Sequence, residues 1–198
     1  MPEKKENGVR RRTRVLAQVA LLIALEIVLN RYGSINTTWL KIGFSFLPMA
    51  LCAMLFGPLW AAGAYAIADF TGYWLNPLGP YHPGFTVCAA LMGLVYGLFL
   101  YRNTFSLEAH SQSVSFEMKL GWARYRFFPN YLVPVFINTV ILGLLLNTLW
   151  ISELYGSRTY WGWFIYRLPQ FAVLIPLNFA LLPLLGRLAG TLKKAGFV

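Results

Sequence analysis

The sequence predicts an all-α integral membrane protein with six transmembrane helices. Its 198 residues are 58% hydrophobic and only 12% charged, so the chain lacks the charged surface that a soluble domain of this size needs. Thirteen of the 17 lysines and arginines fall in three segments, residues 1–14, 102–130 and 187–194, which are separated by apolar runs. This clustering is typical of cytoplasmic flanks, and it predicts that both termini are cytoplasmic.

The positions of the charges decide how the net charge of +10 is interpreted. A nucleic-acid partner is not predicted, because the basic residues flank apolar segments instead of forming one continuous patch. The basic tail, residues 1–14, is expected to lie on the anionic headgroups of membrane lipid. Cys52 and Cys88 both fall in apolar segments, so neither a disulfide framework nor a metal site is predicted.

The first predicted span covers about residues 15–30 and has two unlike faces. At 100° per residue, Ala17, Ala20 and Ala24 share one smooth face, whereas Glu26 and Asn30 lie roughly opposite. The acidic residue and the lack of a convincing cleavage site argue against a secretory signal peptide, so we expect a retained span. We expect the alanine face to dock a partner and the polar face to help hold a solute.

Five further apolar segments predict the remaining spans, at about residues 44–56, 59–75, 86–101, 131–151 and 164–188. Loops 32–41, 76–85 and 152–163 are expected outside, and residues 102–130 and 191–198 inside. Trp39 in the first loop is either an interfacial anchor or a lid over a ligand. The spacing of Ala89, Gly93 and Gly97 predicts close helix packing. Three prolines, at positions 169, 176 and 183, are expected to bend or break the last span unless neighbouring groups satisfy the freed carbonyls.

Polar side chains gather at the predicted outer ends of four spans. They are Glu26 on the first span, Asp69 on the third, Asn147 with Trp150 on the fifth, and Arg167 with Gln170 on the sixth. Charged groups at membrane depth are costly unless paired or hydrated, so this convergence predicts a solute-binding site. Alternatively, Glu26 and Asp69 pair with Arg31 or Arg167 and only tie helices together. Aromatic residues in all three outer loops favour a planar, partly anionic solute.

Catalysis is poorly supported by the sequence. It holds only two histidines, His82 and His110, and shows neither metal-ligand spacing nor a nucleophile motif. A phosphate-binding GxxxxGK[ST] loop is also missing, so the chain itself is not expected to be an ATPase. We therefore predict a non-catalytic protein with no catalytic residue, no metal and no cofactor. Uphill transport would draw its energy from a partner or an ion gradient.

Several motifs together resemble one family of membrane proteins. They are Ala20-Leu-Leu-Ile-Ala24 extended by Ala17, the run KIGFSFLPMALCAMLFGPLWAAGAYAIADFTGY at 41–73, and GPYHPGFT at 79–86. With them the chain resembles the substrate-capture subunits (S components) of energy-coupling-factor (ECF) vitamin transporters, from residue 15 to about 190. Asn147-Thr148-Leu149-Trp150 and Arg167-Leu168-Pro169-Gln170 are most similar to the folate type. Residues 103–128 are longer and more polar than that family's connection.

The resemblance implies a six-helix subunit of the prokaryotic plasma membrane that captures folate with high affinity. It also implies a transmembrane coupling subunit, which the alanine face would contact, and two cytoplasmic ATPases that supply the energy. The expected stacking surfaces are Trp39, Tyr81, Phe85 and Trp150. The expected partners of the pterin edge are Glu26, Asp69, Asn147 and Gln170. Those of the glutamate carboxylates are Arg31, Lys41 and Arg167, with Asn30 and His82 completing the site.

Three alternatives remain open from the sequence. The first keeps the family but replaces folate by another flat vitamin, such as riboflavin or thiamine. The second is a small membrane-integral enzyme acting on a lipid-soluble substrate, in which Asp69 or His82 would be essential. The third is a purely structural membrane subunit that binds no small molecule.

Overall fold

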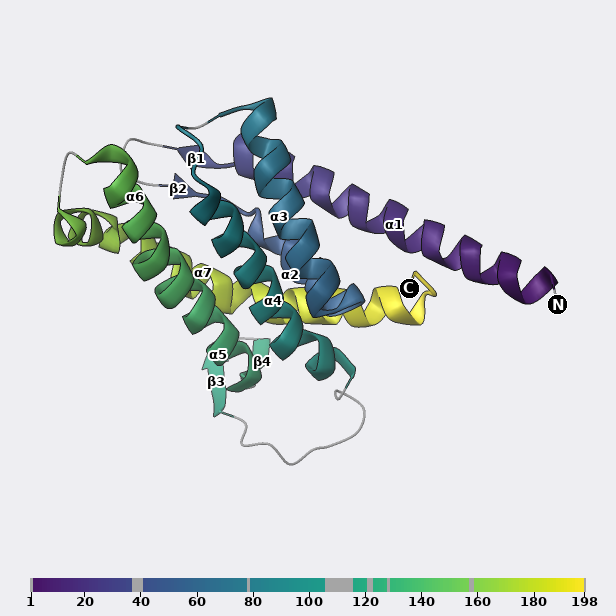
Figure 1. Cartoon of the computed structure of the whole chain (residues 1–198). Coiled ribbons are helices and arrows are strands. Elements are labelled where there is room, and N and C mark those ends of the chain that lie inside the picture. Colours follow the sequence, from purple (N-terminus) through teal and green to yellow (C-terminus); the bar gives the residue numbers. More distant parts are fainter. Residues whose placement is uncertain are drawn as a thin grey trace.

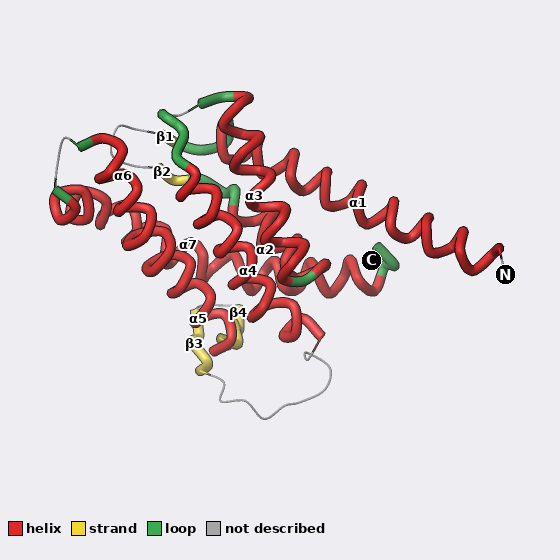
Figure 2. The backbone as a smooth tube through the Cα atoms, viewed as in Figure 1, coloured by secondary structure: helices red, strands yellow, loops and turns green. Residues whose placement is uncertain are grey.

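A computed structural model of the chain describes residues 2–36, 41–77, 79–105, 116–120, 123–127, 129–156 and 159–197. Within these residues the chain forms a bundle of six helical rods (Figures 1 and 2). The fifth rod consists of three consecutive segments. The helical elements are α1 (Pro2–Arg31), α2 (Phe46–Phe56), α3 (Pro58–Leu75), α4 (Pro83–Phe105), α5 (Pro129–Phe136), the π-helical η2 (Ile137–Leu146), α6 (Asn147–Tyr155) and α7 (Tyr160–Lys194).

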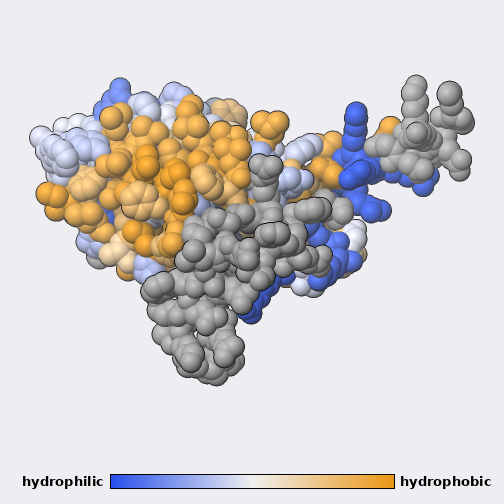
Figure 3. Space-filling model, turned by 90° about the horizontal axis from the view of Figure 1, so that it is seen from below, coloured by the Kyte–Doolittle hydropathy of each residue, from blue (hydrophilic) through white to orange (hydrophobic). Residues whose placement is uncertain are grey.

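The six predicted helices are present, and four of them are long and apolar enough to cross a membrane. The four candidate spans are Val9–Arg31, Pro83–Tyr101, Tyr131–Tyr155 and Tyr160–Lys194. Helix α2 has only 11 residues, which is too short for a full crossing in helical form. An orange hydrophobic surface covers much of the bundle in Figure 3, and blue hydrophilic residues gather toward the N-terminal part of α1. The chain is thus a multi-pass membrane protein.

The basic N-terminal segment is helical, where the sequence predicted a solvated tail up to residue 14. Helix α1 begins at Pro2 and runs without interruption to Arg31. Lysine, arginine and glutamate are good helix formers, and each residue added to an existing helix gains one hydrogen bond at little further cost. The apolar span therefore extends into the basic segment. Residues 9–14 are exposed, and in Figure 1 this part of α1 projects beyond the bundle.

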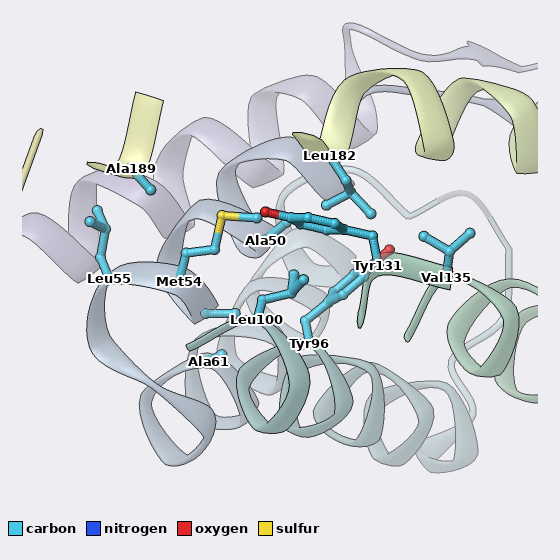
Figure 4. Close-up of a cluster of buried hydrophobic side chains, with 11 residues drawn as sticks. Ala50, Met54, Leu55, Ala61, Tyr96, Leu100, Tyr131, Val135, Leu182 and Ala189 are labelled. Atoms are coloured by element: carbon cyan, nitrogen blue, oxygen red, sulfur yellow. The ribbon is translucent and has the colours of Figure 1, made fainter. Parts of the chain in front are cut away.

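The main apolar core lies between α2, α3, α4, α5 and α7 (Figure 4). Its largest fully buried side chains include Met54, Leu100 and Leu182. Beside it, α4 approaches α3 very closely: a Cβ atom built on Gly93 would lie 2.5 Å from the carbonyl oxygen of Ala61. A Cβ atom built on Gly97 would likewise lie too close to the backbone of Pro58, at the start of α3. The structure confirms the predicted packing role of these glycines, because only the missing side chain lets the two backbones meet.

Helix α7 contains Pro169, Pro176 and Pro183, yet it remains helical from Tyr160 to Lys194. The helix is therefore not broken at the prolines, which is the case that the sequence left open where neighbouring groups satisfy the freed carbonyls. Proline removes one hydrogen bond from a helix, but inside a membrane neighbouring groups and small backbone adjustments can compensate the loss. The fifth rod deviates from α-helix instead, since ten of its residues form the π-helical segment η2.

Two short antiparallel ladders supplement the helices, so the predicted all-α class holds for the bundle but not for every connection. Strands β1 (Ile35–Asn36) and β2 (Lys41–Ile42) pair within the connection between α1 and α2, which we expected to be an outer loop. Strands β3 (Phe116–Leu120) and β4 (Ala123–Phe127) form a hairpin in the stretch that we expected to be one cytoplasmic connection. Its register places Glu117 opposite Arg126. Charged and apolar residues alternate along β3, which is the two-residue period of a strand.

Candidate solute-binding site

The predicted site residues gather at one end of the bundle. This end holds the C-terminal ends of α1 and α3, the start of α4, the end of α6 and the start of α7, together with the loops that join them (Figure 2). Both termini lie away from it in Figure 1. This end of the bundle therefore holds residues as far apart in the sequence as Glu26 and Arg167, which are separated by 141 positions. The contacts within this end form three groups.

The first group joins α3 to the loop before α4. The hydroxyl of Thr86 donates a hydrogen bond to the Asp69 carboxylate over 2.8 Å, and the hydroxyl groups of Thr86 and Tyr81 lie 3.2 Å apart. The Tyr81 ring lies beside the Tyr73 ring, with their centroids 5.0 Å apart. Asp69 is thus held by a hydroxyl network, and Tyr81, which is exposed, belongs to a small aromatic cluster.

The second group is an aromatic stack around Trp150 of α6. The rings of His82 and Trp150 are stacked with their centroids 5.1 Å apart, and Phe85 meets His82 edge-on at 6.0 Å. The Trp150 indole N–H donates to the sulfur of Cys88 over 3.3 Å. A Cβ atom on Gly84 would lie 2.6 Å from the Trp150 ring, so this position requires glycine. One face of Trp150 is therefore covered by His82 and Gly84.

His82 is fixed by its own loop. Its Nδ1 atom accepts a hydrogen bond from the backbone N–H of Gly84 over 3.1 Å, and its Nε2 atom lies 3.8 Å from a carboxylate oxygen of the exposed Glu153. A separation of 3.8 Å is too long for a hydrogen bond. The described contacts thus give His82 a stacking role against Trp150 and a weak electrostatic contact with Glu153.

The third group links α6 to α7 through Arg167. A guanidinium N–H of Arg167 donates to the hydroxyl of Thr148 over 2.8 Å, and the guanidinium carbon lies 5.3 Å from the centroid of the Phe171 ring. Beside it, Gln170 is buried. The side-chain oxygen of Asn147 is also buried, and it accepts no hydrogen bond from any described residue. A cation and an amide acceptor are therefore available on neighbouring positions of two helices.

Glu26, Asn30 and Arg31 form a separate arrangement at the end of α1. The Asn30 amide donates to the buried Glu26 carboxylate over 2.9 Å. Arg31 donates to the backbone oxygen of Asn76 over 3.0 Å, at the end of α3. The structure therefore places these three residues at the end of the bundle that holds the other predicted site residues, in contacts within α1 and with the end of α3.

The helix-tie alternative required ion pairs between the two carboxylates and the two arginines. Within the part of the chain that the structure describes, Arg31 and Arg167 each donate to a neutral oxygen, and neither pairs with Glu26 or Asp69. Trp39 lies outside the described residues. Lys41 is placed in β2, and its side chain is not described. The site as described is thus built mainly from α3, α4, α6 and α7.

Among the residues that the structure places in these contacts, sequence reasoning did not assign Thr86, Thr148 and Phe171 to the site. Thr86 and Thr148 belong to the motifs GPYHPGFT and NTLW, so a search for hydroxyl groups near the predicted charges would have found them. Phe171 gives no such signal, because it stands in an apolar run where most residues face lipid or core.

The described residues contain no group of three or more histidine, cysteine and acidic side chains that could hold a metal ion. Cys52 and Cys88 are both free thiols and buried. The chemistry that these groups offer is recognition: an aromatic stack, an amide acceptor, a hydroxyl-bonded carboxylate and a guanidinium suit a flat, hydrogen-bonding solute that carries negative charge.

The alanine face of α1 lies on the outside of the molecule. Ala17, Ala20 and Ala24 are exposed, whereas Val19, Leu22 and Glu26 of the same helix are buried against its neighbours. The flanking Leu21 and Val28 are also exposed. One side of α1 is therefore a smooth apolar strip that no described residue of this chain covers.

Comparison with known proteins identifies the family. The family model described as "ECF transporter, substrate-specific component" matches residues 14–186. A protein named folate transporter FolT from Clostridium novyi (strain NT) is 33% identical over 168 residues, which are 85% of this chain and 85% of the relative. A protein of the same name from Streptococcus mutans is 26% identical over 193 residues, 92% of each chain.

Solved structures agree with these relatives. A crystal structure of FolT bound with folic acid is 32% identical, with a TM-score of 0.69 over 88% of this chain and 92% of that one. The S-component for biotin from an ECF-type ABC transporter has a TM-score of 0.61 over 93% of both chains, and at 17% identity it shows the fold alone. With a family model that covers most of the sequence, this chain belongs to the substrate-specific components of ECF transporters.

Proposed function

We propose that this chain captures folate at the outer face of a prokaryotic plasma membrane and delivers it as one subunit of an ECF-type ABC transporter. The relatives named folate transporter and the folic acid-bound neighbour support folate over other vitamins. The observation that carries the proposal is that Trp150, with its aromatic neighbours, and Arg167 lie at the same end of the bundle. An aromatic surface suits a pterin ring, and a guanidinium suits a glutamate carboxylate.

Within this proposal the site residues have separate roles. The stacking surfaces are Tyr81, Phe85 and Trp150, with Trp39 as a further ring. The carboxylates and amides at this end, Asp69, Glu26, Asn147 and Gln170, are candidates for the donor and acceptor edge of the pterin. The cations Arg31, Lys41 and Arg167 are candidates for the carboxylates. His82 supports Trp150, and Asn30 supports Glu26.

Folate binding is directly measurable. The purified chain is expected to show saturable quenching of tryptophan fluorescence by folic acid at submicromolar concentration, because Trp150 lies within the proposed site. Riboflavin serves as the comparison ligand and is expected to bind much more weakly. If folic acid gives no response below micromolar concentration while riboflavin does, the family stands and the vitamin is wrong.

Delivery of the solute requires partner subunits. We propose that the exposed alanine strip of α1 contacts a transmembrane coupling subunit, and that two cytoplasmic ATPase subunits supply the energy. Small residues let another helix backbone approach closely, and the strip offers Ala17, Ala20 and Ala24 on one side of the helix. The sequence has no phosphate-binding GxxxxGK[ST] loop, so ATP hydrolysis falls to the partners.

Replacing Ala24 by tryptophan is expected to abolish folate uptake by the assembled transporter and to change folic acid affinity less than twofold. The bulky ring would hold the partner helix away, whereas the site residues of α1 lie off this exposed strip and the remaining ones lie on other elements. Uptake into proteoliposomes and binding to the isolated chain measure the two effects separately. Ala180→Trp is the matched control, because Ala180 is exposed on α7 and lies outside the strip. Equal losses of binding and uptake in Ala24→Trp would contradict the two-sided role of α1.

An enzymatic role makes a different prediction. It requires turnover of a substrate by the isolated chain and loss of that turnover in Asp69→Asn or His82→Ala. The relatives are named as transporter components, and His82 makes a stacking contact with Trp150. We therefore expect stoichiometric binding without product formation, which analysis of the recovered ligand by mass spectrometry would establish.

A further inference from the structure

Thr148 is a fully buried polar residue next to the proposed site. It has no exposed surface, and its hydroxyl lies 2.8 Å from a guanidinium nitrogen of Arg167. A side chain without exposed surface does not reach a solute unless the site rearranges, so its contact with Arg167 is its available role. We propose that Thr148 is a positioning residue that orients Arg167 toward the carboxylate of the bound solute. This inference rests on the proposed function.

Two contacts from different directions hold the guanidinium. From α6, the Thr148 hydroxyl accepts a hydrogen bond from one N–H of the Arg167 guanidinium. From the next turn of α7, the Phe171 ring lies beside the same guanidinium. A guanidinium is planar and carries five N–H donors in a fixed fork. With one donor engaged by Thr148 and an aromatic ring beside the group, the fork is held at two points, and four donors remain. Two parallel donors of this fork match the two oxygens of a carboxylate.

The hydrogen-bond partner of Arg167 is an uncharged hydroxyl. A glutamate or aspartate in place of Thr148 would orient the arginine equally well, but it would also neutralise it. Among the described residues, Arg167 contacts a neutral hydroxyl and an aromatic ring, and it pairs with no carboxylate. A cation in a low-dielectric site gains much from an anionic partner. A hydroxyl therefore fixes the geometry while the positive charge stays available for the solute.

Orienting the Arg167 side chain before the solute binds is expected to raise the binding affinity. Arginine has many rotamers, and their loss on binding lowers affinity unless the side chain is already held. Thr148 sits directly after η2 and Asn147, on the rod that faces α7. The hydroxyl is thus presented by a packed helix and not by a loop, which suits a positioning role.

The test is a double-mutant cycle on the full-length protein, with folic acid as the probe and tryptophan quenching as the readout. Thr148→Val keeps the shape but removes the hydroxyl, and it is expected to weaken binding about tenfold. In the Arg167→Leu background the same change is expected to cost less than about twofold, because the group that it orients is gone. Thr148→Ser is expected to restore affinity to within about twofold.

The outcomes are distinct. Equal losses in both backgrounds would show a purely structural role and overturn the proposal, as would wild-type affinity in Thr148→Val. Thr139→Val is the control, since Thr139 is a buried threonine of the same rod that does not contact Arg167. A wild-type chain that binds no folic acid would reject the proposed function itself. Wild-type binding with an unaffected Thr148→Val would reject only the positioning role.

Discussion

Replacement of Arg167 by leucine is expected to weaken folic acid binding by about a hundredfold or more. The change removes the cation that α7 presents beside Thr148 and leaves a carboxylate of the solute without a partner in a partly buried site. Truncating one member of a desolvated charge pair costs about 2–5 kcal/mol, mostly because the other member stays buried and unpaired. Isothermal titration or fluorescence quenching of the purified chain measures the loss.

Arg187→Leu is the matched control for this experiment. Arg187 is an exposed arginine of the same helix, close to its C-terminal end and remote from the site. Its replacement is expected to leave the affinity unchanged. Arg167→Lys is expected to fall between wild type and leucine, because it keeps the charge but loses the planar fork. Wild-type affinity in a folded Arg167→Leu protein would remove Arg167 from the site.

The second large effect concerns stability. Gly93→Ala is expected to lower the free energy of unfolding by about 3 kcal/mol, because the added Cβ atom would lie 2.5 Å from the Ala61 backbone oxygen and backbone atoms do not move aside cheaply. The helices α3 and α4 would have to separate along their common surface. The midpoint of thermal unfolding in detergent is therefore expected to fall by several degrees.

Gly63→Ala gives the opposite expectation. A Cβ atom on Gly63 would meet no heavy atom within 4 Å, and the residue is exposed on α3. Alanine is the better helix former by about 1 kcal/mol, so this variant is expected to be as stable as the wild type or slightly more so. If the two variants unfolded at the same temperature, close packing at Gly93 would not hold the α3–α4 pair together.

Thr148, Arg167 and Gly93 affect different properties of one protein. Arg167 supplies charge to the proposed site, Thr148 orients it, and Gly93 allows α3 and α4 to approach each other. The alanine strip of α1 lies elsewhere, among exposed apolar residues. Binding, stability and coupling are therefore expected to respond to separate substitutions. This separation is what a capture subunit that docks to a partner requires.

Much of the fold could be predicted from the sequence, because it depends on local properties. Apolar length and charge clustering gave six helices, and helical periodicity distinguished the alanine side of α1 from the side that carries Glu26. The glycine ridge of α4 was also recognisable from its four-residue spacing. The hairpin of β3 and β4 could have been predicted as well, since its residues alternate with a period of two.

Other features could not be read from local patterns. The extension of α1 into the basic segment and the continuity of α7 through three prolines depend on the rest of the helix and on its neighbours. The π-helix η2 was not predicted, and it matters for the site. A π-helix has more residues per turn than an α-helix, so residues beyond it face a different direction from the one that an α-helical pattern implies.

By itself the sequence determined the class of the protein, a helical membrane subunit, and the end of the bundle at which Asp69, Trp150 and Arg167 would lie. Only the tertiary structure decided which of these residues meet. It paired Trp150 with His82, Asp69 with Thr86 and Arg167 with the buried Thr148, and it set Arg31 against the backbone at the end of α3. The physical reason is that periodicity defines the faces of one helix, whereas the rotation of that helix against its neighbours follows from close packing and from irregular segments such as η2.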